Sequence, residues 1–146
     1  MSVEVNASER VMRRTSVYVD GYSHSNPIPA ACRVDQIVYS SIIHGVDASS
    51  GNGAGTLEEQ AQLMFARLRE IVEAAGGTTD DVVKVTMWMR NRADREAVNR
   101  FWLEMFPDAD DRPARQTVNA QLDGDQLITC DFVAVINDRE RGTERS

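Results

Sequence analysis

Residues 56–89, TLEEQAQLMFARLREIVEAAGGTTDDVVKVTMWM, predict a helix followed closely by a strand. Thr56 and Glu59 have the spacing of a capping box, in which each side chain satisfies a free backbone N–H of the other at a helix start. Apolar residues then recur every three or four positions as far as Gly76, which is a typical helix stop. We therefore expect an amphipathic helix over residues 56–75.

Residues 82–89 alternate in polarity, as a β-strand does. One face is expected to carry Val83, Val85, Met87 and Met89, and the other Lys84, Thr86 and Trp88. A second helix is expected to begin at Asp94, a good N-cap, and to end near Phe106, because Pro107 discourages continuation. Its buried stripe would consist of Val98, Phe101, Trp102 and Met105.

β-Branched and aromatic residues predict the remaining strands. These are expected at residues 14–19, in a short segment through Val34, and at residues 36–43, 115–120 and 127–136. Residues 123–125, Asp-Gly-Asp, carry a hairpin signal that would join the last two strands. The expected fold is α+β, a single mixed sheet with two helices on one face. Residues 14–136 would form the domain, between a polar leader (1–13) and a charged, mobile tail (137–146).

Apolar residues occupy both faces of the last strand, with Leu127, Val133 and Val135 opposite Ile128, Phe132 and Ile136. Two helices cover only one face of a sheet, so the other face must be buried elsewhere, and subunit association is the simplest way. This pattern predicts an obligate oligomer.

Composition excludes several classes of protein. The 146 residues carry a net charge of −7, which disfavours nucleic acid and anionic membrane surfaces as partners. No apolar stretch approaches the length of a membrane span, and we expect a cytoplasmic protein. The two cysteines, Cys32 and Cys130, are expected to be reduced, and no His or Cys pair has the spacing of a metal site.

Several short segments, in one order, resemble the Rid (YjgF, reactive-intermediate deaminase) family. They are Tyr39-Ser40-Ser41, Ala75-Gly76-Gly77 followed by Val83-Lys84-Val85, Asn99 with Phe106, and Pro113-Ala114-Arg115-Gln116-Thr117-Val118. The resemblance implies a homotrimer of a chorismate-mutase-like unit that binds a small carboxylate in clefts between subunits. It implies hydrolysis of reactive enamines and imines to 2-keto acids and ammonia, without metal or cofactor.

Arg115 matches the family's substrate-binding arginine. A guanidinium offers two parallel donors to a carboxylate and keeps its charge in a partly dry cleft. The alternative is a surface ion pair with Asp110 or Asp111. Strand alternation places Thr117 on the same face as Arg115. Ser41 and Asn99 match positions that line the family's cleft, although a backbone-bonded strand residue and a surface amide are their ordinary roles.

The family's water-positioning glutamate has no counterpart here. Matching of the final strand places Thr129 at that position, whose hydroxyl can orient a water but cannot accept its proton near neutral pH. Asp131 lies on the same face and could supply a carboxylate, whereas an ungapped register from Arg115 places Cys130 there.

Two functions therefore stay open. The first is a C=N hydrolase, with Arg115 as carboxylate clamp and Thr129 or Asp131 acting on water. The alternative is a non-catalytic trimer that binds or senses a keto acid, which loss of the glutamate favours. Ribonuclease activity fits poorly with the acidic composition. Tyr22 or His24 could fold back to fill the cleft, although an exposed loop is the preferred expectation for both.

Overall fold

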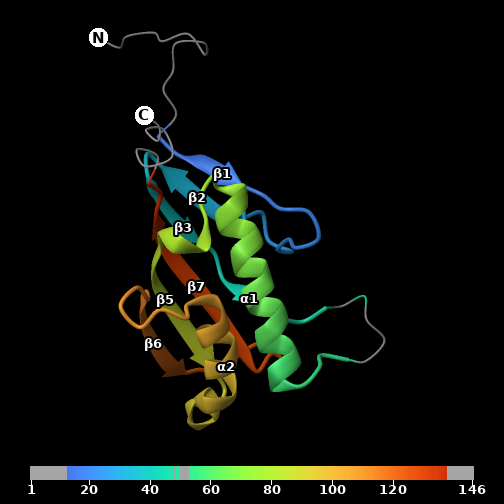
Figure 1. Cartoon of the computed structure of the whole chain (residues 1–146). Helices are drawn as coiled ribbons and strands as arrows, with labels where there is room; N and C mark the ends of the chain where they lie inside the picture. The colour runs from blue at the N-terminus through green and yellow to red at the C-terminus, as the bar shows by residue number, and fades with distance from the viewer. Residues whose placement is uncertain (1–12, 48, 50–52, 138–146) are drawn as a thin grey trace, which may run out of the picture.

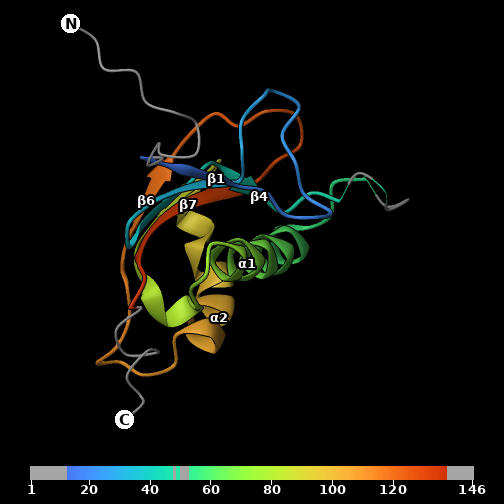
Figure 2. The ribbon, with the colours of Figure 1, turned by 90° about the horizontal axis from the view of Figure 1, so that it is seen from above.

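The computed structural model describes residues 13–47, 49 and 53–137. A single sheet has the strand order β1-β2-β3-β7-β5-β6, with β4 pairing beside β7. Both long helices lie on one face of this sheet (Figures 1 and 2). The strands are β1 (Thr15–Val17), β2 (Ala31–Val34), β3 (Ile37–Ser40), β4 (Ile43–His44), β5 (Val82–Met89), β6 (Ala114–Asn119) and β7 (Ile128–Val135). The α+β prediction is confirmed.

Helix α1 (Leu57–Ala74) begins as expected. The Thr56 hydroxyl accepts a hydrogen bond from the backbone N–H of Glu59, and the Glu59 carboxylate accepts one from the N–H of Thr56. The helix buries one stripe against the sheet, including Met64, Leu68 and Val72. These contacts make α1 the main cover of the core.

Strand β5 has the predicted limits, but one residue, Val83, does not lie on its predicted face. Val82 pairs with Ala134 and Lys84 with Val133, so Val83 is an extra residue with no partner on β7. Such a bulge changes the alternation of side chains. Val83 is consequently 45% exposed instead of sharing the buried face of Val85, Met87 and Met89.

The second helix starts differently from the prediction. Asn91, not Asp94, accepts the capping hydrogen bond, and it begins a 3-10 turn, η3 (Arg92–Arg95). Helix α2 (Glu96–Met105) continues from this turn without a side-chain cap. Its buried residues are Val98, Phe101 and Trp102, with Met105 partly buried, as the apolar stripe predicts.

The last two strands do not form a hairpin, because β5 lies between them. Strand β6 pairs with β5 in parallel, and β7 pairs with β5 in the antiparallel direction. The intervening loop crosses the end of β5, where the Arg90 guanidinium donates to the carbonyls of Leu122, Gly124 and Gln126. A local turn signal cannot reveal a third strand inserted between its two neighbours.

The N-terminal strands are shorter than predicted. The strand expected at residues 14–19 is limited to β1, and that at 36–43 is divided at Ser41 and Ile42 into β3 and β4. The expected leader and tail fall largely on residues 1–12 and 138–146, which lie outside the described residues.

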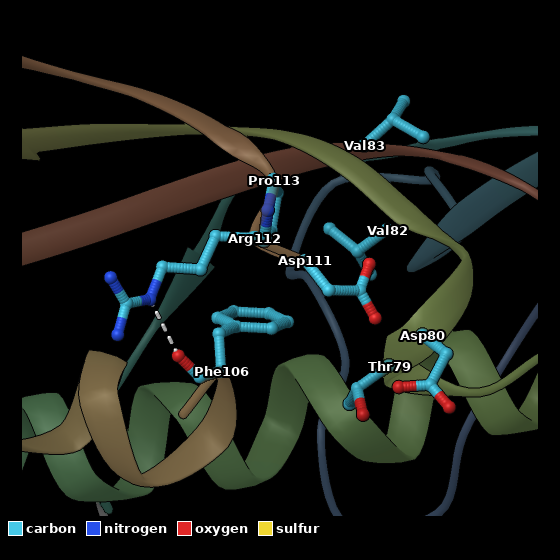
Figure 3. A pocket seen from close by; sticks show the side chains of 8 residues that line it. All are labelled: Thr79, Asp80, Val82, Val83, Phe106, Asp111, Arg112 and Pro113. Atoms are coloured by element: carbon cyan, nitrogen blue, oxygen red, sulfur yellow. Dashed lines mark hydrogen bonds between the residues drawn. The ribbon is translucent and has the colours of Figure 1, made fainter. Parts of the chain in front are cut away.

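The face of the sheet opposite the helices is partly apolar. Its exposed side chains include Tyr39 at 61%, Ile37 and Val135. Val83 also lies on this side of the sheet, away from Phe106 (Figure 3). We call it the open face. No helix in the described ranges is long and apolar enough to cross a membrane.

Tyr22 is buried, which corrects the expectation of an exposed loop residue. Its hydroxyl donates to the Ile42 carbonyl at 3.0 Å and accepts from the His44 N–H at 3.1 Å. The Arg67 guanidinium lies over the Tyr22 ring and donates to the carbonyls of His44 and Val46. His24, half-buried, packs edge-on against Tyr22, so this cluster joins the 20–30 loop to α1.

We expect Gln60→Leu to destabilise the protein strongly. The Gln60 side chain is fully buried; its Oε1 accepts from the Leu127 N–H, and its Nε2 donates to the carbonyls of Gly55 and Asp125. Leucine would leave these backbone groups without their partner, at a cost of about 3 kcal/mol. Urea unfolding at fixed protein concentration measures this loss. Gln62→Leu, at an exposed position of α1, is the matched control, and equal stability of the two variants would contradict the prediction.

We also expect the free energy of unfolding to fall as the pH drops below about 6.5, the ordinary pKa of histidine. Burial lowers the pKa of His24, and burial together with the Arg67 charge lowers that of His44. When folding lowers the pKa of a histidine, its contribution to the free energy of unfolding is complete above the pKa of the unfolded state. That contribution is lost as the pH falls through the lower pKa of the folded state. The neutral form also fits the hydrogen bond from the Val46 N–H to His44 Nδ1.

Urea unfolding at pH values from 5 to 7.5 tests this dependence. His44→Asn, whose amide oxygen can replace Nδ1 as acceptor, should weaken the dependence between about pH 6.5 and 5. An unchanged pH profile in this variant would rule out His44 as a contributor.

Candidate functional site

Arg115 lies on the edge strand β6, and its side chain is on the helix side of the sheet. It pairs with Val85, which is fully buried under the helices. The guanidinium carbon of Arg115 is 5.0 Å from the centroid of the Trp102 ring on α2. Stacking on an indole fixes a planar guanidinium while leaving its N–H groups free to bind a planar anion.

The charge of Arg115 has no partner within the described ranges. Arg67, Arg90 and Arg112 each donate to backbone carbonyls. Arg115, by contrast, makes no hydrogen bond or ion pair with any residue that the structure describes, including Asp110 and Asp111. Partial burial lowers its pKa, and the nearby positive charge of Arg95 lowers it further. This half-buried cation is therefore available to an external anion.

Two other predicted residues share a face with Arg115 or with Trp102. Thr117 pairs with Met87 and so shares the helix-facing side of β6. Asn99 is half-buried and lies three residues before Trp102 on α2, which places both on one helix face. The fold thus places Arg115, Thr117 and Asn99 on the helix side of the sheet, at β6 and α2, and we call this region the β6–α2 groove.

Thr129 and Asp131 lie on the open face of β7, on the other side of the sheet. Trp88 Nε1 donates to Asp131 Oδ2 at 2.9 Å, which fixes the carboxylate. Thr129 pairs with Trp88 and is 2% exposed, and its hydroxyl has no hydrogen-bond partner among the described residues. It lines a cavity of about 350 Å³ together with Ile42, Trp88 and residues of the 120–126 loop.

Cys130 points in the opposite direction from Thr129 and Asp131. It pairs with Met87 in the core and is fully buried. Burial and, to a smaller degree, the Asp131 charge raise the pKa of its thiol far above neutral. A protonated, inaccessible thiol can act neither as nucleophile nor as base at neutral pH.

Ser41 does not meet Arg115 within one chain. Its hydroxyl donates to the Pro29 carbonyl at 2.8 Å, which is the ordinary role of such a residue. It follows β3, and the order β3-β7-β5-β6 separates it from Arg115 by three strand spacings, about 14 Å. The predicted residues thus form two groups on opposite faces, with Ser41 apart from the β6–α2 groove.

A separate small cavity, of about 180 Å³, lies near the start of β5 (Figure 3). Asp80 and Asp111 both line it and give it an acidic character that repels carboxylates. Arg112 extends away from these two side chains, and its Nε donates to the Phe106 carbonyl at 2.8 Å. Within the described ranges no group of three or more His, Cys, Asp or Glu residues could hold a metal.

Sequence reasoning missed the two tryptophans that orient these groups. Trp102 is expected only in the buried stripe of the second helix, and Trp88 only on a strand face with Lys84 and Thr86. In the structure, Trp102 contacts Arg115 and Trp88 binds Asp131. The alternation of β5 placed Trp88 on the open face, but its hydrogen bond depends on the pairing of β5 with β7. That pairing leaves no local signal in either strand.

Comparison with known proteins gives consistent matches. A family model described as endoribonuclease L-PSP matches residues 21–136. The chain is 32% identical over 112 residues to a 2-iminobutanoate/2-iminopropanoate deaminase of Dermatophagoides farinae, covering 75% of this chain and 86% of that protein. It is also 32% identical over 97 residues to the 3-aminoacrylate deaminase RutC of Acinetobacter baylyi, covering 66% and 75% of the two chains.

The solved structure of yeast Mmf1 has the same fold. It gives a TM-score of 0.76 over 85% of this chain and 99% of that chain, at 19% identity. The family match covers the whole sheet from β2 to β7, both helices and every candidate residue. The chain therefore belongs to the Rid (YjgF) family, the family described as endoribonuclease L-PSP.

Proposed function

We propose that the protein hydrolyses small 2-imino acids, or their enamine tautomers, to 2-keto acids and ammonia. The observation that carries this proposal is the unpaired, half-buried guanidinium of Arg115, stacked on Trp102. It would bind the substrate carboxylate through two parallel N–H donors, with Asn99 and Thr117 alongside. Relatives that are named as imine and aminoacrylate deaminases support this chemistry.

Hydrolysis adds water to the C=N carbon and releases ammonia. One group must orient the water and accept its proton, while the substrate nitrogen gains protons as the C–N bond breaks. Asp131 is our candidate base, because Trp88 holds Oδ2 and no described residue bonds its other oxygen. Thr129, with its free hydroxyl, would orient the water. None of these steps needs a metal or cofactor.

The proposal requires more than one chain, because Arg115 and Asp131 lie on opposite faces of the sheet. The exposed apolar side chains of the open face, Ile37, Tyr39, Val83 and Val135, favour its burial against other copies. We propose a homotrimer, in which Arg115 of one chain and Thr129 with Asp131 of a neighbour line each cleft. Ser41 of the neighbour could then approach the cleft as well.

A second function, carboxylate binding without turnover, is favoured by a specific observation. The match of the final strand to the family places Thr129 where the family has its glutamate, and the Asp131 carboxylate is already bonded to Trp88. A hydroxyl cannot accept a proton from water near neutral pH, and a hydrogen bond to a carboxylate weakens it as a base. Such a protein would bind keto acids and sense their concentration.

We expect Arg115→Ala to reduce the catalysed release of ammonia by about 100-fold or more, since loss of a bidentate charged pair removes about 3 kcal/mol of binding. The assay generates 2-iminobutanoate in situ and follows ammonia with and without protein. Arg115→Lys should retain part of the activity, because it keeps the charge but not the two parallel donors.

Arg69→Ala, at an exposed position of α1, is the charge-matched control and should behave as wild type. Full activity in Arg115→Ala would remove Arg115 from the site. Tight, Arg115-dependent binding of 2-oxobutanoate without any acceleration would support the binding protein.

Asp131→Asn separates the proton acceptor from the structural role of this residue. An amide oxygen can still accept from Trp88 Nε1, so the fold and the keto-acid affinity should persist. If Asp131 is the base, turnover should fall about 100-fold or more. Thr129→Val, which removes only the hydroxyl, should have a smaller effect. Undiminished turnover in Asp131→Asn would show that another group accepts the proton.

A further inference from the structure

The β6–α2 groove contains a second guanidinium, that of Arg95. Arg95, Asn99 and Trp102 are spaced by four and three residues, so they form one stripe along α2. Trp102 contacts Arg115, and the stripe therefore faces the side of β6 that carries Arg115 and Thr117. Arg95 thus lies at one end of this stripe. Arg115 lies at the other end, over Trp102, and the neutral amide of Asn99 is between them.

The turn that carries Arg95 is tied to the neighbouring strand. Its Nη1 donates to the Arg92 carbonyl at 2.9 Å. The Arg92 N–H in turn donates to Asn119 Oδ1, at the end of β6, at 2.8 Å. The 3-10 turn η3, which ends at Arg95, is thereby tied to the end of β6, two residues beyond Thr117. The charge of Arg95 reaches Arg115, where it contributes to the lowered pKa.

These two cations share no counter-charge within the described part of the chain. Neither has an ion pair with a carboxylate in the parts of the chain that the structure describes, although Asp and Glu outnumber Lys and Arg by 23 to 16 in the sequence. Like charges at this proximity destabilise the empty groove, and an anion bound between them removes that cost. A ligand with one carboxylate can satisfy only one of them.

We infer that the groove selects 2-imino and 2-keto acids that carry a second carboxylate, such as 2-iminoglutarate and 2-oxoglutarate. The inference rests on the proposed function, in that Arg115 takes the carboxylate next to the reacting carbon. Arg95 takes the distal carboxylate, and Asn99, between them, offers amide donors. Seven residues of helix span about 10 Å between Arg95 and Trp102, and the long side chains reduce the separation between the two charges.

The reaction of such a substrate is the same hydrolysis as that proposed for 2-imino acids with one carboxylate. Water adds across the C=N bond of 2-iminoglutarate, the C–N bond breaks, and 2-oxoglutarate and ammonia leave. The distal carboxylate does not react, so Arg95 is a specificity-determining residue and not a catalytic one. Its contribution should appear in affinity, and only for ligands with two carboxylates.

Calorimetric titration of 2-oxoglutarate and 2-oxobutanoate into the protein tests the inference. We expect wild type to bind 2-oxoglutarate about tenfold more tightly. Arg95→Gln should remove this preference while leaving the affinity for 2-oxobutanoate within about twofold. Arg100→Gln is the matched control, because Arg100 lies on the opposite side of α2, over the Phe101 ring, and the substitution makes the same change of charge.

Three results would overturn the inference. The first is equal affinity of wild type for the two keto acids. The second is an equal loss of affinity for both ligands in Arg95→Gln. The third is competition by inorganic phosphate as strong as that by 2-oxoglutarate, which indicates an unselective anion site. Ammonia release from 2-iminobutanoate is measured in parallel. Arg95-dependent binding of 2-oxoglutarate without imine turnover would reject the proposed deaminase function but support the preference for two carboxylates. Turnover of 2-iminobutanoate without a preference for 2-oxoglutarate would reject that preference alone.

Discussion

The antiparallel pairing of β5 with β7 fixes the arrangement of the whole chain. Its register, from Val82 opposite Ala134 to Met89 opposite Ile128, decides which side chains face the helices and which face away. Strands β3, β4 and β6 attach directly to one of these two, and β2 and β1 follow β3. The same register directs Asp131 to the open face and, through the pairing of β6 with β5, Arg115 to the helix side. The division of the candidate site between two faces follows from it.

Local chemistry predicted the elements whose signals lie within a few residues. The Thr56–Glu59 capping box and the limits of β5 are confirmed, because a cap depends on residues three apart and a strand on its own alternation. The bulge at Val83 depends on how β5 meets β7, more than forty residues away, and could not be seen. The same holds for the turn at residues 123–125, where β5 separates the two strands that it joins.

The candidate site was predictable to a similar extent. The segment around Arg115 marked it as the candidate carboxylate binder, but nothing near it indicated that Trp102 would lie under its guanidinium. Thr129 and Asp131 were placed on one face by alternation, which the pairing supports, whereas their separation from Arg115 is a property of the sheet order. Arg95 could have been noticed, because it precedes Trp102 by two helical turns, but its importance depends on the position of β6.

The two-faced arrangement has a consequence for evolution within the family. A residue on the open face of β7 can change without disturbing the packing around Trp102, and the β6–α2 groove can change without disturbing Trp88. Selection can therefore alter one half of the candidate site while preserving the other. Thr129 and Arg115, on opposite faces of the sheet, can thus vary independently of one another.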